Sequence, residues 1–167
     1  MLVDAESLGD LGPAALASAL RPLWEDAGPL VGAMIGRRFG DWEEQLGAAA
    51  EAIAAMDDPT RGALLRAHPR IGTDSATLAR RSTLSHREQG AAMSDATARC
   101  LSTLNDRYEE RFGFPFVAWV AGRPPEAMIV VLEERLGRDR RHELDAGCAA
   151  LVAIAGDRLH FLRSGRP

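Results

Sequence analysis

The sequence predicts an all-α fold from its composition and its periodicity. Alanine supplies 29 of the 167 residues, whereas β-branched and aromatic residues are few, and this balance favours helix over strand. Apolar residues recur at helical spacing, and no short run alternates apolar and polar residues as a half-buried strand does. Since the chain shows no internal repeat and no linker, we expect a single compact multi-helix domain over residues 1–167.

Four helices are predicted in the first part of the chain, because apolar residues recur there three and four positions apart. Pro13 is expected in the first turn of the first helix, and Asp41 can cap the third. Asp58 followed by Pro59 is typical of the N-cap and first position of the fourth. We expect these helices over residues 12–26, 29–38, 41–53 and 58–67.

The rest of the chain contains a long connection and further helices. Residues 68–83 are rich in turn-forming residues, so we expect a loop or a loosely helical connection there. A long helix follows Ser94 and stops at Gly113, after which residues 114–120 form a short extended apolar segment. Other helices are expected from Ser85, from the prolines at 124–125 to Leu136, and over residues 140–162.

The composition excludes several kinds of chemistry. All 20 basic residues are arginine, so the chain has no lysine for an imine, a pyridoxal phosphate anchor or a P-loop. Cys100 and Cys148 lack the spacing of a disulfide framework or a metal site, and we expect no metal. The net charge of −4 makes binding to nucleic acid an unfavourable interpretation. No apolar run is long enough to span a membrane, and the N-terminal residues do not have the pattern of a signal peptide. We therefore expect a cytoplasmic protein.

Arg135 is placed unusually for an arginine. At 100° per residue it falls in the middle of the apolar stripe formed by Met128, Val131 and Leu132. An arginine that points inward should be paired or bound to a ligand, because an unpaired buried charge is costly. Alternatively, the side chain reaches back to solvent near the helix C-terminus, where the helix dipole favours cations. The pattern alone leaves the two interpretations equally supported.

His68 precedes Pro69, which disfavours helical backbone for the histidine and so pushes it out of the helix end. Loops at such junctions commonly carry function. The helix C-terminus also favours a protonated ring, which suits a proton donor. A structural loop histidine remains the alternative.

Ser85 and Glu88 have the spacing of a helix capping box, although the same helix start could also bind an anionic substrate.

Several motifs in a fixed order resemble one known family. They are Ala67-His68-Pro69, Ser85-x-x-Glu88-Gln89, Leu104-Asn105-x-x-Tyr108, Phe112-Gly113-Phe114-Pro115-Phe116 and Glu134-Arg135-Leu136. In this order and spacing the chain resembles the decarboxylases of 2-oxo-4-hydroxy-4-carboxy-5-ureidoimidazoline (OHCU), the last enzymes of the conversion of urate to allantoin. The resemblance runs from about Trp24 to Leu162, whereas residues 1–23 match poorly.

The resemblance implies an all-helical homodimer with no metal and no organic cofactor, acting on a small ureidoimidazoline. It implies that His68 is the catalytic residue and Glu88 its partner. It further implies that the backbone of the segment after Phe116 and the inward-pointing Arg135 belong to the site. The residues implied to bind substrate are Pro69, Ser85, Gln89, Val117, Ala118, Trp119, Val120, Ala121 and Arg135.

The implied reaction matches a chain without lysine, because the substrate carries its own electron sink, a ring C=N bond beside the carbon that loses CO2. In this hypothesis His68 polarises or deprotonates the substrate near that carbon and then protonates it, which fixes the (S) configuration of allantoin. The chain departs from the commonest family form at Arg70-Ile71-Gly72 and after Gln89. Two alternatives therefore stay open: a paralogous lyase or hydrolase of another ureide or specialised metabolite, and a non-catalytic helical interaction module.

Overall fold

A computed structural model describes residues 2–25, 28–73, 84 and 93–164 of the chain. Every regular element of these residues is a helix, which confirms the predicted all-α class. A 3-10 helix that the sequence did not predict precedes the α-helices. The elements are η1 (Ala5–Asp10), α1 (Pro13–Trp24), α2 (Gly28–Met34), α3 (Trp42–Ala55), α4 (Asp58–Ala67), α7 (Asp95–Phe112), α8 (Pro125–Leu136) and α9 (Arg140–Ser164).

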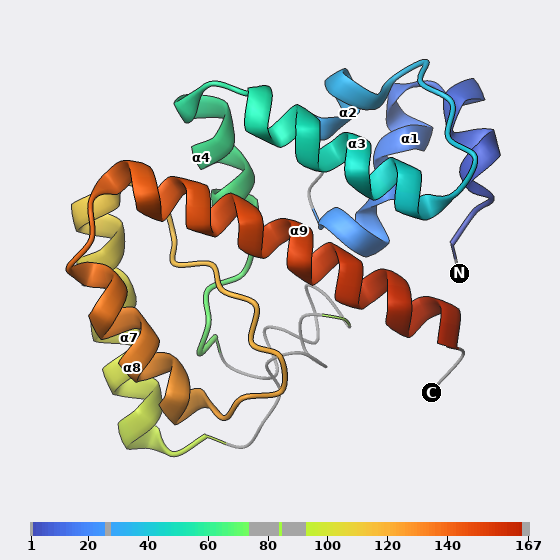
Figure 1. Cartoon of the computed structure of the whole chain (residues 1–167). Helices are drawn as coiled ribbons and strands as arrows, with labels where there is room; N and C mark the ends of the chain where they lie inside the picture. Colours follow the sequence, from blue (N-terminus) through green and yellow to red (C-terminus); the bar gives the residue numbers. More distant parts are fainter. Residues whose placement is uncertain (1, 26–27, 74–83, 85–92, 165–167) are drawn as a thin grey trace.

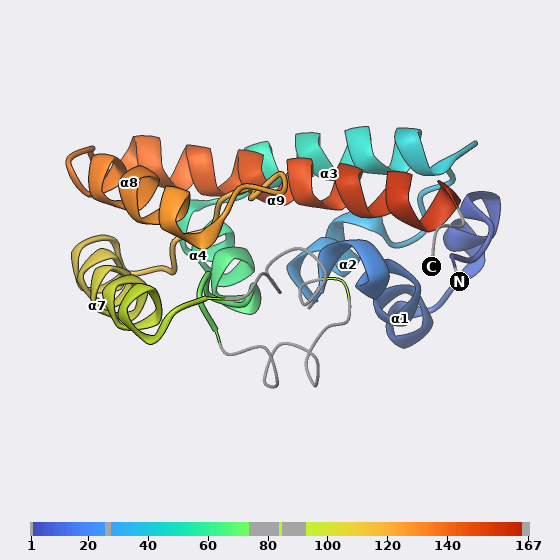
Figure 2. The same cartoon turned by 90° about the horizontal axis from the view of Figure 1, so that it is seen from below.

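The long helix α9 organises the molecule. It packs against α1, α3 and α4, while α7 packs against α8 beside its N-terminal end (Figure 1). Seen from below, α3, α8 and α9 form one layer, and α1, α2, α4 and α7 form the other (Figure 2). The last turn of α4, which ends next to His68, thus lies under the central helix.

Capping residues set several helix boundaries where the sequence predicted them. The Asp41 carboxylate accepts the Glu44 N–H at 2.8 Å, and Ser94 Oγ accepts the Thr97 N–H at 3.1 Å. Gly113 ends α7 in the left-handed conformation at φ 81°.

Three predicted boundaries were wrong by one to a few residues. Asp57, not Asp58, caps α4, because its carboxylate accepts the Thr60 N–H at 2.9 Å. Helix α2 ends at Met34, short of residue 38, and the next turn passes through Gly36 at φ 72°. Helix α1 ends at Trp24 because Glu25 leaves helical geometry with φ 57°. The helix predicted from Ser85 lies outside the described residues.

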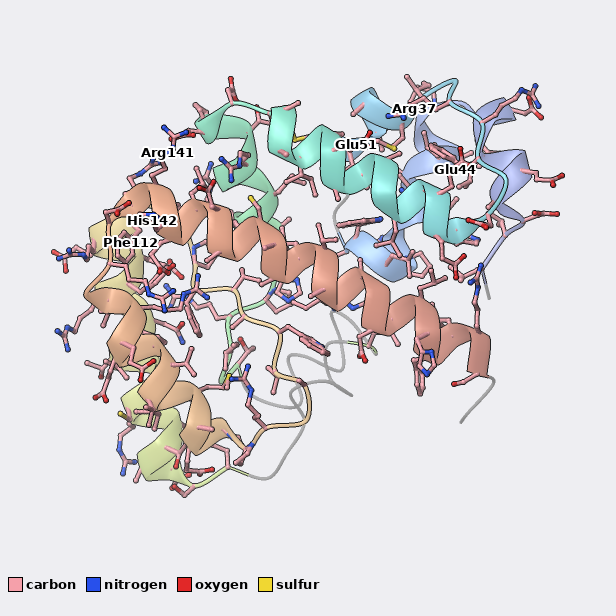
Figure 3. All side chains as sticks on the ribbon, viewed as in Figure 1. Arg37, Glu44, Glu51, Phe112, Arg141 and His142 are labelled. Carbon is pink, nitrogen blue, oxygen red and sulfur yellow. The ribbon has the colours of Figure 1, made fainter. Side chains whose placement is uncertain are left out.

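The core lies between the two layers and is mainly aliphatic, with an aromatic cluster at the α7–α8 end. The ring of Tyr108 packs against Phe112, Phe114 and Phe116 at centroid distances of 4.6, 6.1 and 5.4 Å. Charged residues such as Glu51 of α3 and Arg141 and His142 of α9 lie at the surface (Figure 3). No helix among the described residues combines the length and the apolar character that crossing a membrane requires. The single domain over residues 1–167 stays a prediction.

Candidate active site

His68 lies at the C-terminal end of α4, as the following proline predicted. Its backbone is extended, with φ −82° and ψ 138°, and its N–H donates to the carbonyl of Leu65 at 3.1 Å. The side chain is buried, with 7% of the residue exposed, and Pro69 is buried beside it. The imidazole therefore lies in the protein interior and not on an open loop.

Burial and a neighbouring arginine determine the protonation of His68. Desolvation lowers its pKa from 6.5 to about 4, and the positive charge of Arg158 acts in the same direction, while Glu25 partly opposes both. The ring is therefore neutral at neutral pH. The helix C-terminus favours a protonated ring, and burial outweighs that influence here.

Arg158 reaches this region from α9. Its Nη2 forms an ion pair with Glu25 Oε1 at 2.8 Å, and its Nη1 donates to the carbonyl of Leu23 at 3.2 Å. The residue is 1% exposed, so the whole guanidinium lies in the interior. The end of α1 and the middle of α9 thus place a buried ion pair close enough to His68 to change its pKa.

The sequence interpretation missed Arg158, although the signal was present. Ile154 and Ala155 are buried on α9, and Arg158 shares their face at the i+4 and i+3 positions. The helical-phase argument that singled out Arg135 identifies Arg158 equally well. Glu25 gave no such signal, because it lies at a helix end rather than in an apolar stripe.

Arg135 is buried, as its helical phase predicted, and it is paired. Its Nε donates to Glu143 Oε2 at 2.6 Å and its Nη1 to the carbonyl of Val117 at 3.1 Å. The guanidinium also lies over the ring of Phe116, 4.9 Å from its centroid. The alternative of a side chain that reaches back to solvent was therefore wrong.

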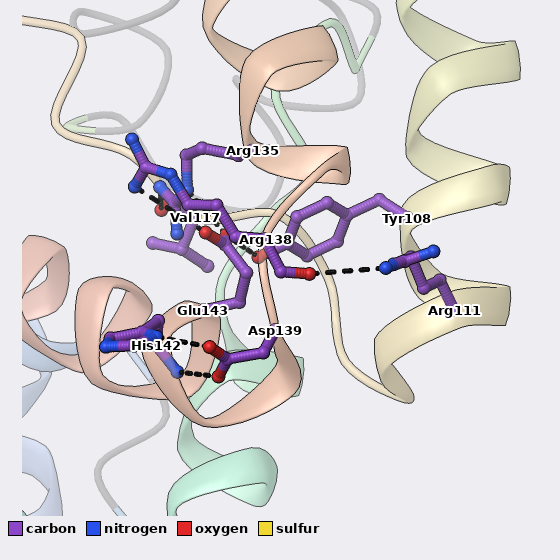
Figure 4. A network of polar contacts seen from close by, with 8 residues as sticks. All are labelled: Tyr108, Arg111, Val117, Arg135, Arg138, Asp139, His142 and Glu143. Carbon is purple, nitrogen blue, oxygen red and sulfur yellow. Dashed lines mark hydrogen bonds and ion pairs between the residues drawn. The ribbon is translucent and has the colours of Figure 1, made fainter.

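Glu143 is the centre of this network, which joins α7, α8 and the start of α9 (Figure 4). Tyr108 donates its hydroxyl to the same Oε2 that accepts from Arg135, and Arg138 Nη1 lies 3.7 Å from Glu143 Oε1. Burial, followed by the bond to Glu143, raises the pKa of Tyr108, so the phenol stays protonated. One buried donor, Nη2 of Arg135, has no hydrogen-bond partner among the residues that the structure describes.

The segment from Val117 to Ala121 is held by two arginines, Arg135 of α8 and Arg123 of the loop that continues the segment. Arg135 binds the carbonyl of Val117, and Arg123 donates to the carbonyls of Trp119 at 2.6 Å and Val120 at 3.0 Å. Ala121 follows in the left-handed region at φ 52°, an uncommon conformation for a residue with a Cβ. Val117 and Ala118 are buried, whereas Trp119 is 45% exposed.

The predicted site residues do not all meet in the described structure. The described interactions link His68 to Arg158 and Glu25, and Arg135 to Glu143 and Val117, and none of them joins the two groups. Ser85, Glu88 and Gln89 lie outside the described residues, so their approach to His68 stays a prediction. Among the described residues, no group of three His, Cys, Asp or Glu side chains could hold a metal ion.

Comparison with known proteins connects this site to a family. The model of the OHCU decarboxylases matches residues 10–160, a span that includes His68, the segment after Phe116 and both buried arginines. The chain belongs to the OHCU decarboxylase family. The matched span begins at residue 10 and so includes α1, and a poorer match over residues 1–23 stays a prediction.

Relatives and solved structures agree with this membership. The chain is 31% identical over 127 residues to the 2-oxo-4-hydroxy-4-carboxy-5-ureidoimidazoline decarboxylase of Haloferax volcanii, covering 74% of this chain and 73% of that one. It superposes on a crystal structure of (S)-allantoin synthase with a TM-score of 0.68 at 19% identity, covering 94% of this chain and 53% of that chain. A crystal structure of an OHCU decarboxylase in the presence of (S)-allantoin gives a TM-score of 0.59 at 23% identity, with 73% and 81% covered. These two structural similarities show the shared fold.

Proposed function

We propose that this chain catalyses the decarboxylation of OHCU to (S)-allantoin. The observation that carries the proposal is the family match over residues 10–160, supported by relatives of that name at 31% identity over most of the chain. The buried, neutral His68 supports a role as proton acceptor, because a neutral imidazole has one ring nitrogen free to take up a proton.

The substrate supplies the electron sink that many decarboxylases take from a lysine imine or a bound cofactor. When CO2 leaves, the electron pair of the broken C–C bond moves into the adjacent ring C=N bond, and the ring nitrogen takes up one proton. The chain has no lysine for the imine alternative. We therefore include independence from metals and organic cofactors in the proposal.

His68 then moves a second proton. The neutral imidazole accepts the proton of the substrate hydroxyl as the C=O bond of the product forms. The resulting imidazolium delivers this proton to the neighbouring carbon, the one that bears the ureido group. Because His68 is held on one side of the substrate, delivery from one face produces a single enantiomer. General acid–base catalysis of this kind contributes about 10²- to 10⁴-fold to a rate.

The two buried arginines have different proposed roles. Arg158, beside His68, keeps the imidazole neutral before the reaction. Arg135 fixes the Val117 carbonyl, and its unpartnered Nη2 is the donor that we assign to a substrate oxygen, because an unsatisfied buried N–H is costly. Glu88 orients His68 in this proposal, with Ser85, Gln89 and Pro69 around the substrate.

Turnover of freshly prepared OHCU by the wild-type chain and by a His68→Ala variant tests the assignment. We expect the wild type to accelerate the loss of OHCU well above its spontaneous decay and the variant to lose most of that acceleration. Equal rates for both proteins would contradict the role of His68. Sedimentation of the wild type tests the proposed homodimer independently, and a cytoplasmic location stays a prediction.

A further inference from the structure

The three residues after Pro69 lie along one face of α7. Arg70 forms a fork with Glu109, Nε to Oε1 at 2.6 Å and Nη2 to Oε2 at 2.7 Å, and its Nη1 reaches Asp106 Oδ1 at 2.9 Å. One turn earlier on α7, the buried Asn105 donates from Nδ2 to the carbonyl of Ile71 at 2.9 Å.

Gly72 continues this arrangement by close packing. A Cβ built on Gly72 would lie 3.0 Å from Leu101 Cδ1, one further turn along α7, and its φ of 84° is the left-handed conformation that favours glycine. Leu101, Asn105 and Glu109 are four residues apart and so share one face of the helix. Residues 70–72 therefore run antiparallel to α7, each held at a successive turn.

The contacts of residues 70–72 with α7 restrict the position of His68, because the two segments are joined through a single residue. Only Pro69 separates His68 from Arg70, and its ring fixes one of the two backbone torsions of that residue. On the other side, the backbone N–H of His68 is bonded to Leu65 in α4. The histidine is thus held between two helices, α4 before it and α7 after it, and on the α7 side Arg70 makes three of the side-chain hydrogen bonds.

We propose that Arg70 is a positioning residue for His68: its fork to Glu109 and Asp106 on α7 fixes the chain after Pro69 and so the direction of the imidazole. The proposal rests on the proposed function, because it assigns to His68 the proton transfer.

Exposure argues against a mainly stabilising role for the fork. The side chain of Arg70 is 41% exposed, and those of Glu109 and Asp106 are 30% and 64% exposed. Ion pairs in such positions contribute little to the free energy of folding. A two-pronged arginine–carboxylate contact does define geometry, however, because both N–H···O bonds are satisfied in only one relative orientation.

The test compares Arg70→Met, Arg70→Glu and the exchange Arg70→Glu/Glu109→Arg with the wild type, at a temperature where all are folded. Arg38→Met is the matched control, since Arg38 also pairs with a carboxylate, Asp10, but on an exposed surface remote from His68. We expect Arg70→Met and Arg70→Glu to lower kcat for OHCU by about 10- to 100-fold with KM unchanged, because misplacement of a reacting group affects chemistry more than binding. The exchange variant should recover most of this loss, and Arg38→Met should match the wild type.

A second readout does not depend on OHCU turnover. The imidazole resonances of His68 in NMR spectra should shift in Arg70→Met and return in the exchange variant. Unchanged resonances would overturn the proposal, and so would an increase in KM alone or a loss of kcat that the exchange does not recover. If the wild type fails to turn over OHCU while the resonances respond as expected, the proposed function is wrong and the positioning of His68 by Arg70 stands.

Discussion

The guanidinium of Arg158 acts on the imidazole of His68 from a helix that lies far away in the sequence, and its charge helps to lower the histidine pKa to about 4. Both side chains are buried, and Glu25 balances Arg158 through an ion pair at 2.8 Å. This arrangement keeps a catalytic candidate neutral in the interior while a positive charge stays near it.

Replacement of Arg158 by methionine should raise the pKa of His68. The variant keeps much of the apolar contact of the arginine but removes its positive charge, so the charge of Glu25, which favours the protonated ring, is no longer opposed. Titration of the His68 resonances by NMR measures the change. A pKa equal to that of the wild type would mean that the charge of Arg158 does not reach the imidazole.

The folded protein should become less stable as the pH is lowered from 6.5, the pKa of His68 in the unfolded chain, to about 4, its pKa in the folded protein. Above pH 6.5 the ring is neutral in both states, whereas below it the unfolded chain takes up a proton that the folded chain refuses down to about pH 4. This difference is worth up to roughly 3 kcal/mol. Because glutamine does not titrate, the free energy of unfolding of His68→Gln should change less between pH 6.5 and pH 4 than that of the wild type.

Urea unfolding of the wild type and His68→Gln at pH 7, 5.5 and 4.5 measures this effect. The stability of the wild type relative to the variant should decrease as the pH falls. A difference that stays constant over the three pH values would contradict the burial of a neutral His68, whatever the absolute stabilities are.

Glu143→Gln should destabilise the protein through the charge that it leaves on Arg135. The buried guanidinium would lose its partner at 2.6 Å, and Tyr108 would donate to a weaker acceptor. Breaking one side of a buried ion pair typically costs about 3–5 kcal/mol. Glu51→Gln, on the exposed face of α3 (Figure 3), is the matched control and should change stability by less than about 0.5 kcal/mol. Similar unfolding midpoints for both variants would contradict the network.

Gly72→Ala should destabilise the protein, by about 1–3 kcal/mol, because the new Cβ would approach Leu101 and the backbone would be strained at φ 84°. Gly47→Ala is the opposite case. Gly47 lies within α3, and a Cβ there would meet nothing within 4 Å, so this variant should gain about 0.5–1 kcal/mol from helix propensity. Thermal unfolding of the two variants should therefore give shifts of opposite sign. A neutral Gly72→Ala would contradict the close approach of this turn to α7.

Much of the fold could be predicted because local chemistry sets the helix ends. Asp41, Ser94 and Gly113 act through their own side chain or backbone, so their effects are visible in the sequence. The end of α2 was predicted too late, although a local signal was present: only Ile35 continues the apolar run beyond Met34, and Gly36 then ends it in the left-handed conformation.

The candidate site was predicted less completely, because its electrostatics depend on contacts between distant segments. The proline after His68 correctly predicted the position of the histidine, and the helical phase correctly predicted that Arg135 is buried. The protonation of His68 depends on burial under α9 and on Arg158, neither of which local sequence around the histidine indicates. The pairing of Arg135 with Glu143 likewise follows from the turn between α8 and α9.

The stereochemistry of the product tests the central proposal most directly. Urate would be oxidised by urate oxidase and opened by hydroxyisourate hydrolase, and allantoin formation followed by circular dichroism with the wild type, with His68→Gln and without this chain. OHCU decays spontaneously to racemic allantoin, so the wild type should produce a rapid signal of (S)-allantoin and the other two samples little or none. A racemic product formed at the spontaneous rate in the presence of the folded wild-type protein would contradict the proposal.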